Sequence, residues 1–429
     1  MQMKMVRRYI AFLILIFLSL GEIYSQQDTL TLSKCVDIAL SKNPQIKIAE
    51  GNFDFTEAAY TSTVSPLYPQ LSFQSSWLKN GGTFLFGPIS RPGNYENYTV
   101  GIQAQQLIFD FGKSYSRVSA AGNLSVASQQ DVTIAKQNVI LATEIAYYNY
   151  LQTQRIKVVA EEIQKQADEH SMQAKAFFEA GKNSQYDVMK AETDLANAKV
   201  NLITAENNVR LSRLQLENTM NTKFKSDDVL QDNLELKQDS ISLDNCINTA
   251  LNNRPEIISS KYLMDANKSL LTSAWTANLP TINATAGYNW KSLALNEPFY
   301  NSWSVGVNFA LPIFQGFSLQ AGIDQARANL KSSEASYDAL TQSVILDVEQ
   351  QYSALTEAKQ RIVATDYLVK QSDETLKLAE GRYKEGVGSP LEITDARVTL
   401  YNAKTSYIQS LYDYHVAYAK LLRAMGTIK

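Results

Sequence analysis

The chain has 429 residues, a formal net charge of -3 and only ten prolines. Nucleic-acid binding needs a concentrated basic surface, and no such cluster occurs, so we expect no nucleic-acid partner. Two cysteines are too few for a scaffold held by disulfides. We expect Cys35 and Cys246 to be small buried packing residues, with a disulfide between them as the alternative.

Residues 1–25 have the layout of a secretory signal peptide. Lys4, Arg7 and Arg8 precede an apolar run at 9–20, and small or polar residues follow. This run is shorter than the roughly 20 residues that a membrane-spanning helix needs. Because no later stretch is apolar over such a length, we expect the mature chain to enter a membrane only as strands.

The remaining chain is a tandem repeat. The pattern Leu-x-x-Cys-x-x-x-Ala-Leu-x-x-x-Pro-x-Ile at 32–46 returns at 243–257, and Leu-x-Asn-Ala-Lys occurs at both 195–199 and 400–404. A period of roughly 200 residues is too long for a solenoid, so one large unit is built twice. We expect a first repeat at 26–221, a polar linker at 222–241 and a second repeat at 242–429.

Each repeat contains a predicted strand hairpin, at 70–106 and at 281–311. Apolar and polar residues alternate in the four strands, and the charged residues Lys79, Asp110 and Lys291 lie outside them. A charge on a lipid-facing strand would cost roughly 2–4 kcal/mol at mid-membrane, so charge-free strands favour a membrane barrel. A sheet that packs on a soluble core is the alternative.

Four strands cannot close a barrel, because the smallest membrane barrels have about eight. We therefore expect several chains to contribute four strands each. The loops inside the hairpins, at 80–97 and 291–301, differ in length, and we expect them to face the outside, where variation is tolerated.

Two long helices are predicted at about 112–180 and 317–385, because these segments lack proline and contain little glycine. At 1.5 Å per residue each would be roughly 100 Å long. Each is followed by a glycine and then by a serine with an acidic residue three positions later, which is typical of a turn and a new helix N-terminus. These turn and cap residues are Gly181, Ser184, Asp187, Gly386, Ser389 and Glu392.

The helices that restart after these turns carry heptads, which predict coiled-coil packing. One row holds large residues, including Val188 and Leu195 in the first copy and Ile393 and Leu400 in the second. The neighbouring row holds small ones: Ala191, Ala198, Ala205, Ser212 and Thr219, then Ala396, Ala403, Ser410, Ala417 and Ala424. A solvated filamentous coiled coil would explain the heptads but not the strand hairpins.

An enzyme is not expected. His170 and His415 stand alone in helical surroundings, and no metalloprotease, nucleophile-elbow or phosphate-loop motif occurs. We expect both histidines to be solvated or packing residues, and no catalytic, metal or cofactor site.

The run Arg-Tyr-x-x-Gly-x-x-Ser at 382–389, followed by Glu392, Asp395 and 400–404, resembles the TolC family of outer membrane efflux proteins. The strand exits at 106–110 and 311–314 agree with it. The resemblance implies a mainly α fold with a small β part. It implies a homotrimer whose twelve-stranded β-barrel crosses the outer-membrane lipid of a Gram-negative bacterium and continues as an α-helical barrel into the periplasm.

The resemblance also implies an export function and its partners. The tunnel would dock on a periplasmic adaptor and an inner-membrane pump and export small molecules or proteins by tripartite efflux or type I secretion. A structural or adhesive coiled-coil protein of the cell envelope, without transport activity, is the alternative.

The resemblance further implies a gate at the periplasmic tip. Asp187 and Tyr383 fall on positions that form a closing contact, and Glu392 and Asp395 fall on an acidic ring. Gly388 stands where the best-known member has a basic tip residue. For Asp187 and Glu392 a helix cap, worth about 1 kcal/mol, is the alternative role. The tip turns, with Gly181, Ser184, Gly386 and Ser389, would dock the adaptor.

Overall fold

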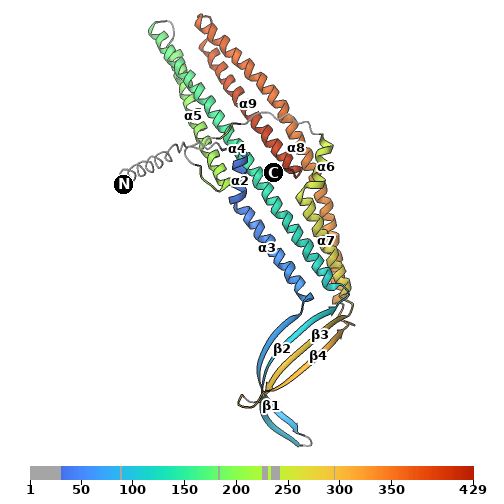
Figure 1. Ribbon diagram of the computed structural model, residues 1–429. Helices are drawn as coiled ribbons and strands as arrows, with labels where there is room; N and C mark the ends of the chain where they lie inside the picture. Colours follow the sequence, from blue (N-terminus) through green and yellow to red (C-terminus); the bar gives the residue numbers. More distant parts are fainter. Residues whose placement is uncertain (1–29, 87–88, 182–183, 225–229, 233–241, 294) are drawn as a thin grey trace, which may run out of the picture.

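The computed structural model describes residues 30–429 except 87–88, 182–183, 225–229, 233–241 and 294. The predicted signal peptide lies outside the described residues. One order of elements occurs twice: two short helices, two strands and two long helices (Figure 1). The first set comprises α2 (Leu32–Lys42), α3 (Pro44–Val64), the 3₁₀ turn η1 (Ser65–Leu67), β1 (Gln70–Phe86), β2 (Ile89–Phe109), α4 (Lys113–Glu179) and α5 (Gln185–Met220). The second comprises α6 (Leu243–Asn253), α7 (Pro255–Thr276), β3 (Thr281–Ser292), β4 (Tyr300–Ala310), α8 (Ser318–Lys384) and α9 (Pro390–Ala424).

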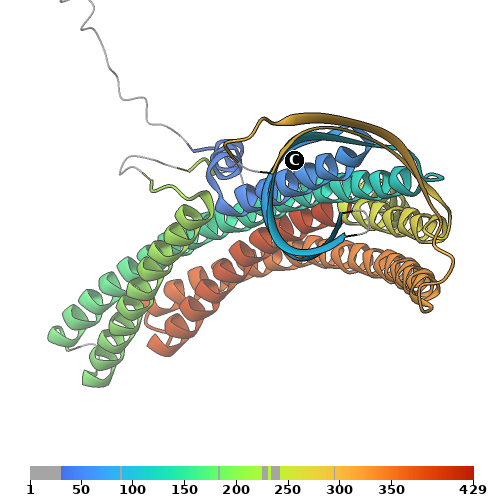
Figure 2. The same ribbon diagram turned by 90° about the horizontal axis from the view of Figure 1, so that it is seen from below.

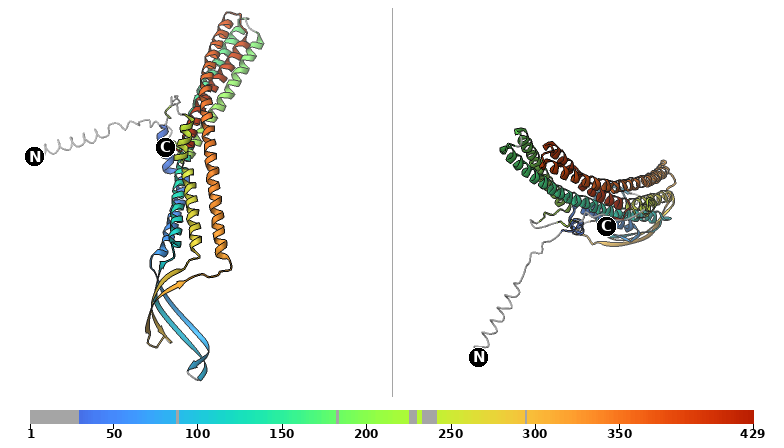
Figure 3. Two further views of the ribbon diagram at one scale, coloured as in Figure 1. Left: turned by 90° about the vertical axis from the view of Figure 1, so that its right-hand side faces the viewer. Right: turned by 90° about the horizontal axis from the view of Figure 1, so that it is seen from above.

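The molecule is elongated, with the sheet at one end and the tips of two helical hairpins at the other (Figures 1 and 3). We call α4–α5 the first helical hairpin and α8–α9 the second. The helices α4 and α8 have 67 residues each, which confirms the two long helices predicted at about 112–180 and 317–385. Viewed along the molecule, the helices form a curved wall rather than a compact bundle (Figure 3).

Local sequence explains where the helices begin. Asn43 caps α3 by accepting a hydrogen bond from the Gln45 N–H at 2.9 Å, and Pro44 occupies the first helical position. Before α4 and α8 the chain makes a sharp turn through two successive residues of positive φ. These are Phe111 (55°) and Gly112 (86°) in the first repeat, and Gly316 (57°) and Phe317 (66°) in the second. A phenylalanine in this region is strained, so the surrounding structure must hold the turn in place.

The four strands form one antiparallel sheet in the order β1-β2-β3-β4, and the β2–β3 pairing joins the two repeats. Seen from below, the sheet curves as an open arc (Figure 2). Its two faces differ. Ile102, Tyr288 and Val305 belong to an apolar face, whereas Ser72, Gln103 and Ser304 belong to a polar one. In the described residues, no helix has an apolar stretch of the length needed to cross a bilayer.

The first strand hairpin is longer than predicted. The expected loop at 80–97 is wrong, because pairing between β1 and β2 continues as far as Phe86 and Ile89. The strands are therefore not free of charge: Lys79 faces Glu96 across the ladder, with an Nζ–Oε1 distance of 3.4 Å, and β3 includes Lys291. A cross-strand pair of opposite charges is compatible with a continuing ladder, which explains why the charges do not end it.

The small-residue heptad rows are buried, as the coiled-coil prediction requires. In α9 the large-residue row is also mostly buried, including Ile393 and Leu400, because α9 packs on both α8 and α4. In α5 the corresponding residues Val188 and Leu195 are only half-buried. The difference arises because α5 lies at the edge of the wall and packs mainly on α4.

Neither cysteine forms a disulfide, and both have 0% exposure. Cys35 packs in a cluster with Leu216 and Tyr147, and Cys246 packs in a second cluster with Tyr414. The expected packing role is confirmed, and the disulfide alternative is wrong because the residues belong to separate cores.

Part of the linker predicted at 222–241 lies across α4. Leu230 forms a parallel bridge with Leu30, and the Tyr147 hydroxyl donates to the Gln231 carbonyl at 2.6 Å. Arg155 pairs with Asp232 at 2.7 Å. These contacts fasten the middle of the linker to the long helix.

Candidate functional site at the helical tips

The first tip, where α4 turns into α5, is closed by backbone caps. Gly181 has a φ of 70°, and its N–H donates to the Phe178 carbonyl at 2.9 Å. Ser184 and Asp187 form a capping box: the Asp187 N–H donates to Ser184 Oγ at 3.3 Å, and the Ser184 N–H donates to Asp187 Oδ2 at 3.0 Å. The carboxylate of Asp187 is thus engaged within its own helix.

The second tip, where α8 turns into α9, is packed more tightly. Gly386 has a φ of 73°, and the N–H groups of Val387 and Gly388 both donate to the Arg382 carbonyl at 3.0 Å. A Cβ at Gly388 would lie 2.8 Å from the Tyr383 nitrogen and 2.9 Å from the Arg382 carbonyl carbon. Because these are backbone atoms, no side chain fits at Gly388, so the turn itself cannot carry a basic group there.

A cation reaches the second tip from the preceding helix instead. Arg382 Nε donates to Glu392 Oε2 at 3.2 Å, and Arg382 Nη2 donates to the Val387 carbonyl at 3.5 Å. Ser389 caps α9 by accepting from the Leu391 N–H. Glu392 Oε2 is therefore bound to Arg382, and in the described contacts Glu392 does not complete a capping box as Asp187 does. Arg382 is part of the family motif at 382–389, but no role at the tip was predicted for it, although its place just before the turn was a usable signal.

Tyr383 is buried inside the second tip, with 8% exposure, among Leu376, Ile393 and Leu400. Its ring also meets the first helical hairpin. The ring centroids lie 5.8 Å from His170 and 6.3 Å from Phe177. Within one chain Tyr383 therefore packs against α4, whereas Asp187 caps α5.

Asp395 lies one turn beyond Glu392 on α9 and is exposed. Its carboxylate has no ion-pair partner among the residues that the structure describes. Of the two acids predicted at the constriction, Glu392 is thus paired with a cation, and Asp395 presents its charge to solvent.

The two helical hairpins are held together by polar contacts that the sequence did not reveal. Asp194 accepts from the Thr394 hydroxyl at 2.7 Å and pairs with Lys190 at 2.5 Å. Further from the tips, Lys404 pairs with Glu162 at 2.8 Å. Lys190 and Asp194 lie on the same helix, but the other two contacts each join residues from different repeats. No local sequence pattern could identify those contacts between repeats.

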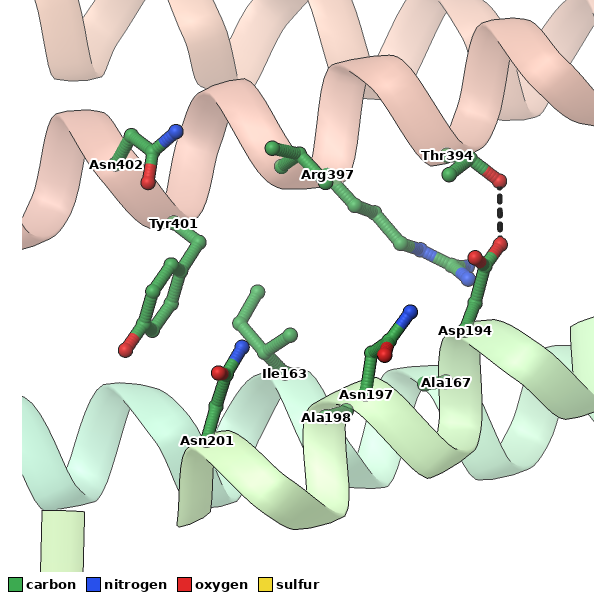
Figure 4. Close-up of a pocket in the computed structure, with 11 residues that line it drawn as sticks. Ile163, Ala167, Asp194, Asn197, Ala198, Asn201, Thr394, Arg397, Tyr401 and Asn402 are labelled. Atoms are coloured by element: carbon green, nitrogen blue, oxygen red, sulfur yellow. Dashed lines mark hydrogen bonds between the residues drawn. The ribbon is translucent and has the colours of Figure 1, made fainter. Parts of the chain in front are cut away.

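A cleft of about 320 Å³ lies between the hairpins near these contacts (Figure 4). Arg397 from α9 reaches across it toward Asp194, while Tyr401 and Asn201 line its other end. Arg397 Nη2 donates to Glu380 at 3.2 Å, but its buried Nε has no hydrogen-bond partner among the residues that the structure describes. A buried donor without a partner costs about 1–3 kcal/mol, so this part of the contact between the hairpins is poorly satisfied.

Comparison with known proteins identifies the family. The family model described as outer membrane efflux protein matches residues 35–222 and again 246–427. Outer membrane protein TolC of Escherichia coli K12 is 25% identical over 457 residues, covering 97% of this chain and 86% of the relative. A probable efflux pump outer membrane protein, TtgC of Pseudomonas putida, is 24% identical over 402 residues, covering 92% and 82%.

Solved structures share the fold. The CmeC outer membrane channel of Campylobacter jejuni matches with a TM-score of 0.82 and 21% identity, covering 92% of this chain and 85% of that one. The outer-membrane channel OprN matches with a TM-score of 0.84 and 18% identity, covering 94% and 91%. Since the family model spans both repeats, this chain belongs to the outer membrane efflux protein family.

Proposed function

We propose that the chain is one subunit of a trimeric channel-tunnel that exports solutes or proteins across the outer membrane. As a family member, it is an efflux protein of the Gram-negative outer membrane, with helices that extend into the periplasm. The observation that carries the proposal is the shape of the chain. The chain forms a curved wall, and its sheet has one apolar and one polar face.

The open arc supports an oligomer. The outer edges of β1 and β4 have no strand beside them in the described chain, and exposed strand edges normally find partners. Four strands are too few for a barrel, whereas three chains would supply twelve. The helices offer a matching edge, because α5 carries exposed apolar residues at heptad-like spacing on its free side. These are Tyr186, Met189, Val200, Ile203, Leu211 and Leu214.

The faces of the sheet suit a membrane barrel. Exposed apolar side chains such as Phe73, Trp303 and Val307 would face the outer-membrane lipid. Polar side chains such as Gln74 and Gln105 would line a water-filled interior. A structural or adhesive coiled coil would need neither face, which argues against that alternative.

The proposed organisation of the chain follows the repeat. A signal peptide at 1–25 would be removed on export. The repeats at 26–221 and 242–429, joined by the linker at 222–241, would each supply one strand hairpin and one helical hairpin. The matches of the family model to 35–222 and 246–427 support this division.

The tips are the proposed gate and docking site. Channels of this type work with periplasmic adaptors and inner-membrane pumps. We place adaptor docking at the exposed turns around Gly181, Ser184, Gly386 and Ser389. We place the gate at Asp187, Tyr383, Glu392 and Asp395. A passive tunnel needs no cofactor and no catalytic step.

Purified protein tests the proposal directly. We expect protein in detergent to have the mass of three chains by light scattering, and to conduct ions after insertion into a planar bilayer. Val305→Lys, on the apolar face, should block insertion, whereas Ser304→Lys, on the polar face of the same strand, should be tolerated. A water-soluble monomer without conductance would refute the channel.

A further inference from the structure

His170 occupies an unusual place for an ionisable side chain. It lies on α4 close to the first tip, with 5% exposure, and its ring meets the edge of Tyr383 from α8 at 5.8 Å. It also lines a cavity of about 320 Å³ between α4 and the second helical hairpin. The imidazole is therefore part of the surface along which the two hairpins touch.

Charged groups surround this cavity from every packed element. Glu169 lies on α4 itself, Glu380 and Lys384 come from α8, and Arg397 comes from α9. From α5, Asp194 acts on His170 at longer range. Two of the three acids are already engaged, since Glu380 binds Arg397 and Asp194 binds Lys190 and Thr394. The third acid, Glu169, is exposed to solvent, and Arg397 and Lys384 already place two cations at the cavity, so a charged imidazole would be poorly stabilised there.

The neutral imidazole is the form that this packing favours. Burial lowers the pKa of His170 below its ordinary value of 6.5, and the Arg397 charge lowers it further, against weaker opposite effects of Asp194 and Glu380. A lowered pKa means that protonation weakens the packed arrangement. The contribution of the neutral ring is complete above about pH 6.5 and is lost as the pH falls toward the lowered pKa.

We propose that His170 is a pH-sensitive switch that holds α4 against the second helical hairpin when neutral and loosens that contact when protonated. Water that enters the polar-lined cavity would stabilise a charged imidazole. This hydration would separate the ring from Tyr383 and Arg397. Arg397 Nε, which is buried and has no hydrogen-bond partner among the described residues, lies in the same contact and would also be stabilised by water.

The switch belongs to one repeat only. Thr375 occupies the equivalent position in the second repeat and cannot be charged. The chain contains only two histidines, so His415 is the other side chain that ordinarily titrates near pH 6. Asp131 is a further candidate, since burial raises its pKa, although a hydrogen bond from Ser259 opposes this. Both lie elsewhere and provide matched controls.

Hydrogen exchange of the full-length protein in detergent tests the switch. Between pH 7.5 and 5.5, after correction for the intrinsic exchange rate, protection of peptides covering 163–179 and 376–397 should fall by about threefold or more. His170→Phe keeps an aromatic ring against Tyr383 without a titratable group, so its protection should not change with pH. His415→Phe and Asp131→Asn should both retain the fall seen in the natural protein.

Two outcomes would overturn the proposal: constant protection in the natural protein, or a fall that persists in His170→Phe. If His170→Phe misfolds by circular dichroism, His170→Gln replaces it, with the same expectation. The effect on conductance rests on the proposed channel function, whereas exchange does not. If protection falls with pH but no conductance is seen at any pH, the channel is refuted and the switch stands. If the protein conducts but protection stays constant, the switch is refuted and the channel stands.

Discussion

The two tips come from one duplicated unit, yet they hold their equivalent acids in different ways. Asp187 and Glu392 occupy the same position after the turn. Asp187 completes a capping box, whereas Glu392 binds Arg382, whose equivalent in the first repeat is Phe177. Backbone hydrogen bonds close both turns, but the acid of the first tip binds the N-cap residue, whereas the acid of the second tip forms a half-exposed ion pair. The two copies share the positive φ of Gly181 and Gly386, while the partners of the following acids differ.

Gly388→Ala should produce the largest effect. The added Cβ would meet backbone atoms of Arg382 and Tyr383 at 2.8–2.9 Å, so the turn must open. We expect a loss of about 1–3 kcal/mol in the local stability of the second tip, measured by hydrogen exchange of peptides covering 376–397.

The matched control is Gly381→Ala in the last turns of α8. A Cβ there meets nothing within 4 Å, so this change should stabilise the helix by up to about 1 kcal/mol. Equal changes in local stability for Gly388→Ala and Gly381→Ala would mean that the tight packing at Gly388 does not contribute to the stability of the second tip.

Asp395→Ala tests the charge difference between the tips. The equivalent residue in the first repeat is Lys190, which Asp194 neutralises, whereas Asp395 is exposed. In the proposed trimer, three such carboxylates would attract cations at the constriction. We expect the substitution to weaken block by divalent cations by roughly tenfold in a planar bilayer, because the carboxylates that hold the blocking cation are removed.

Lys190→Ala is the control for this change, and it should leave cation block close to that of the natural protein. If Asp395→Ala leaves cation block unchanged, Asp395 is an ordinary surface charge. The charge difference between the two tips would then have no functional role.

Replacing the two equivalent acids should give the smallest effects and different salt dependence. Asp187→Ala removes the acidic partner of a capping box and should cost the first tip about 1 kcal/mol, most of which should persist at high salt because it comes from short hydrogen bonds. Glu392→Ala breaks a half-exposed ion pair and should cost about 0.2–1 kcal/mol at low salt and less at high salt. Hydrogen exchange at two salt concentrations measures both, and the same salt response at the two tips would contradict the comparison.

Much of the site could be located from sequence because its signals are local. Gly181 and Gly386 mark the turns, and Ser184 and Ser389 mark the helix starts, since a turn or cap depends on a few neighbouring residues. The pairing of Arg382 with Glu392 was missed because the two residues lie on opposite sides of the turn. Thr394 and Asp194 were missed because they meet only when the two hairpins pack.

The sequence by itself determined the duplicated order of elements, the long helices and the alternating strands, because periodicity and the absence of proline act within each segment. Tertiary structure alone decided how far the first strand hairpin extends, with Lys79 opposite Glu96. It also decided that His170 is buried against Tyr383 beside Arg397. These features join groups from distant segments, and the free energy of such contacts depends on packing that no local pattern records.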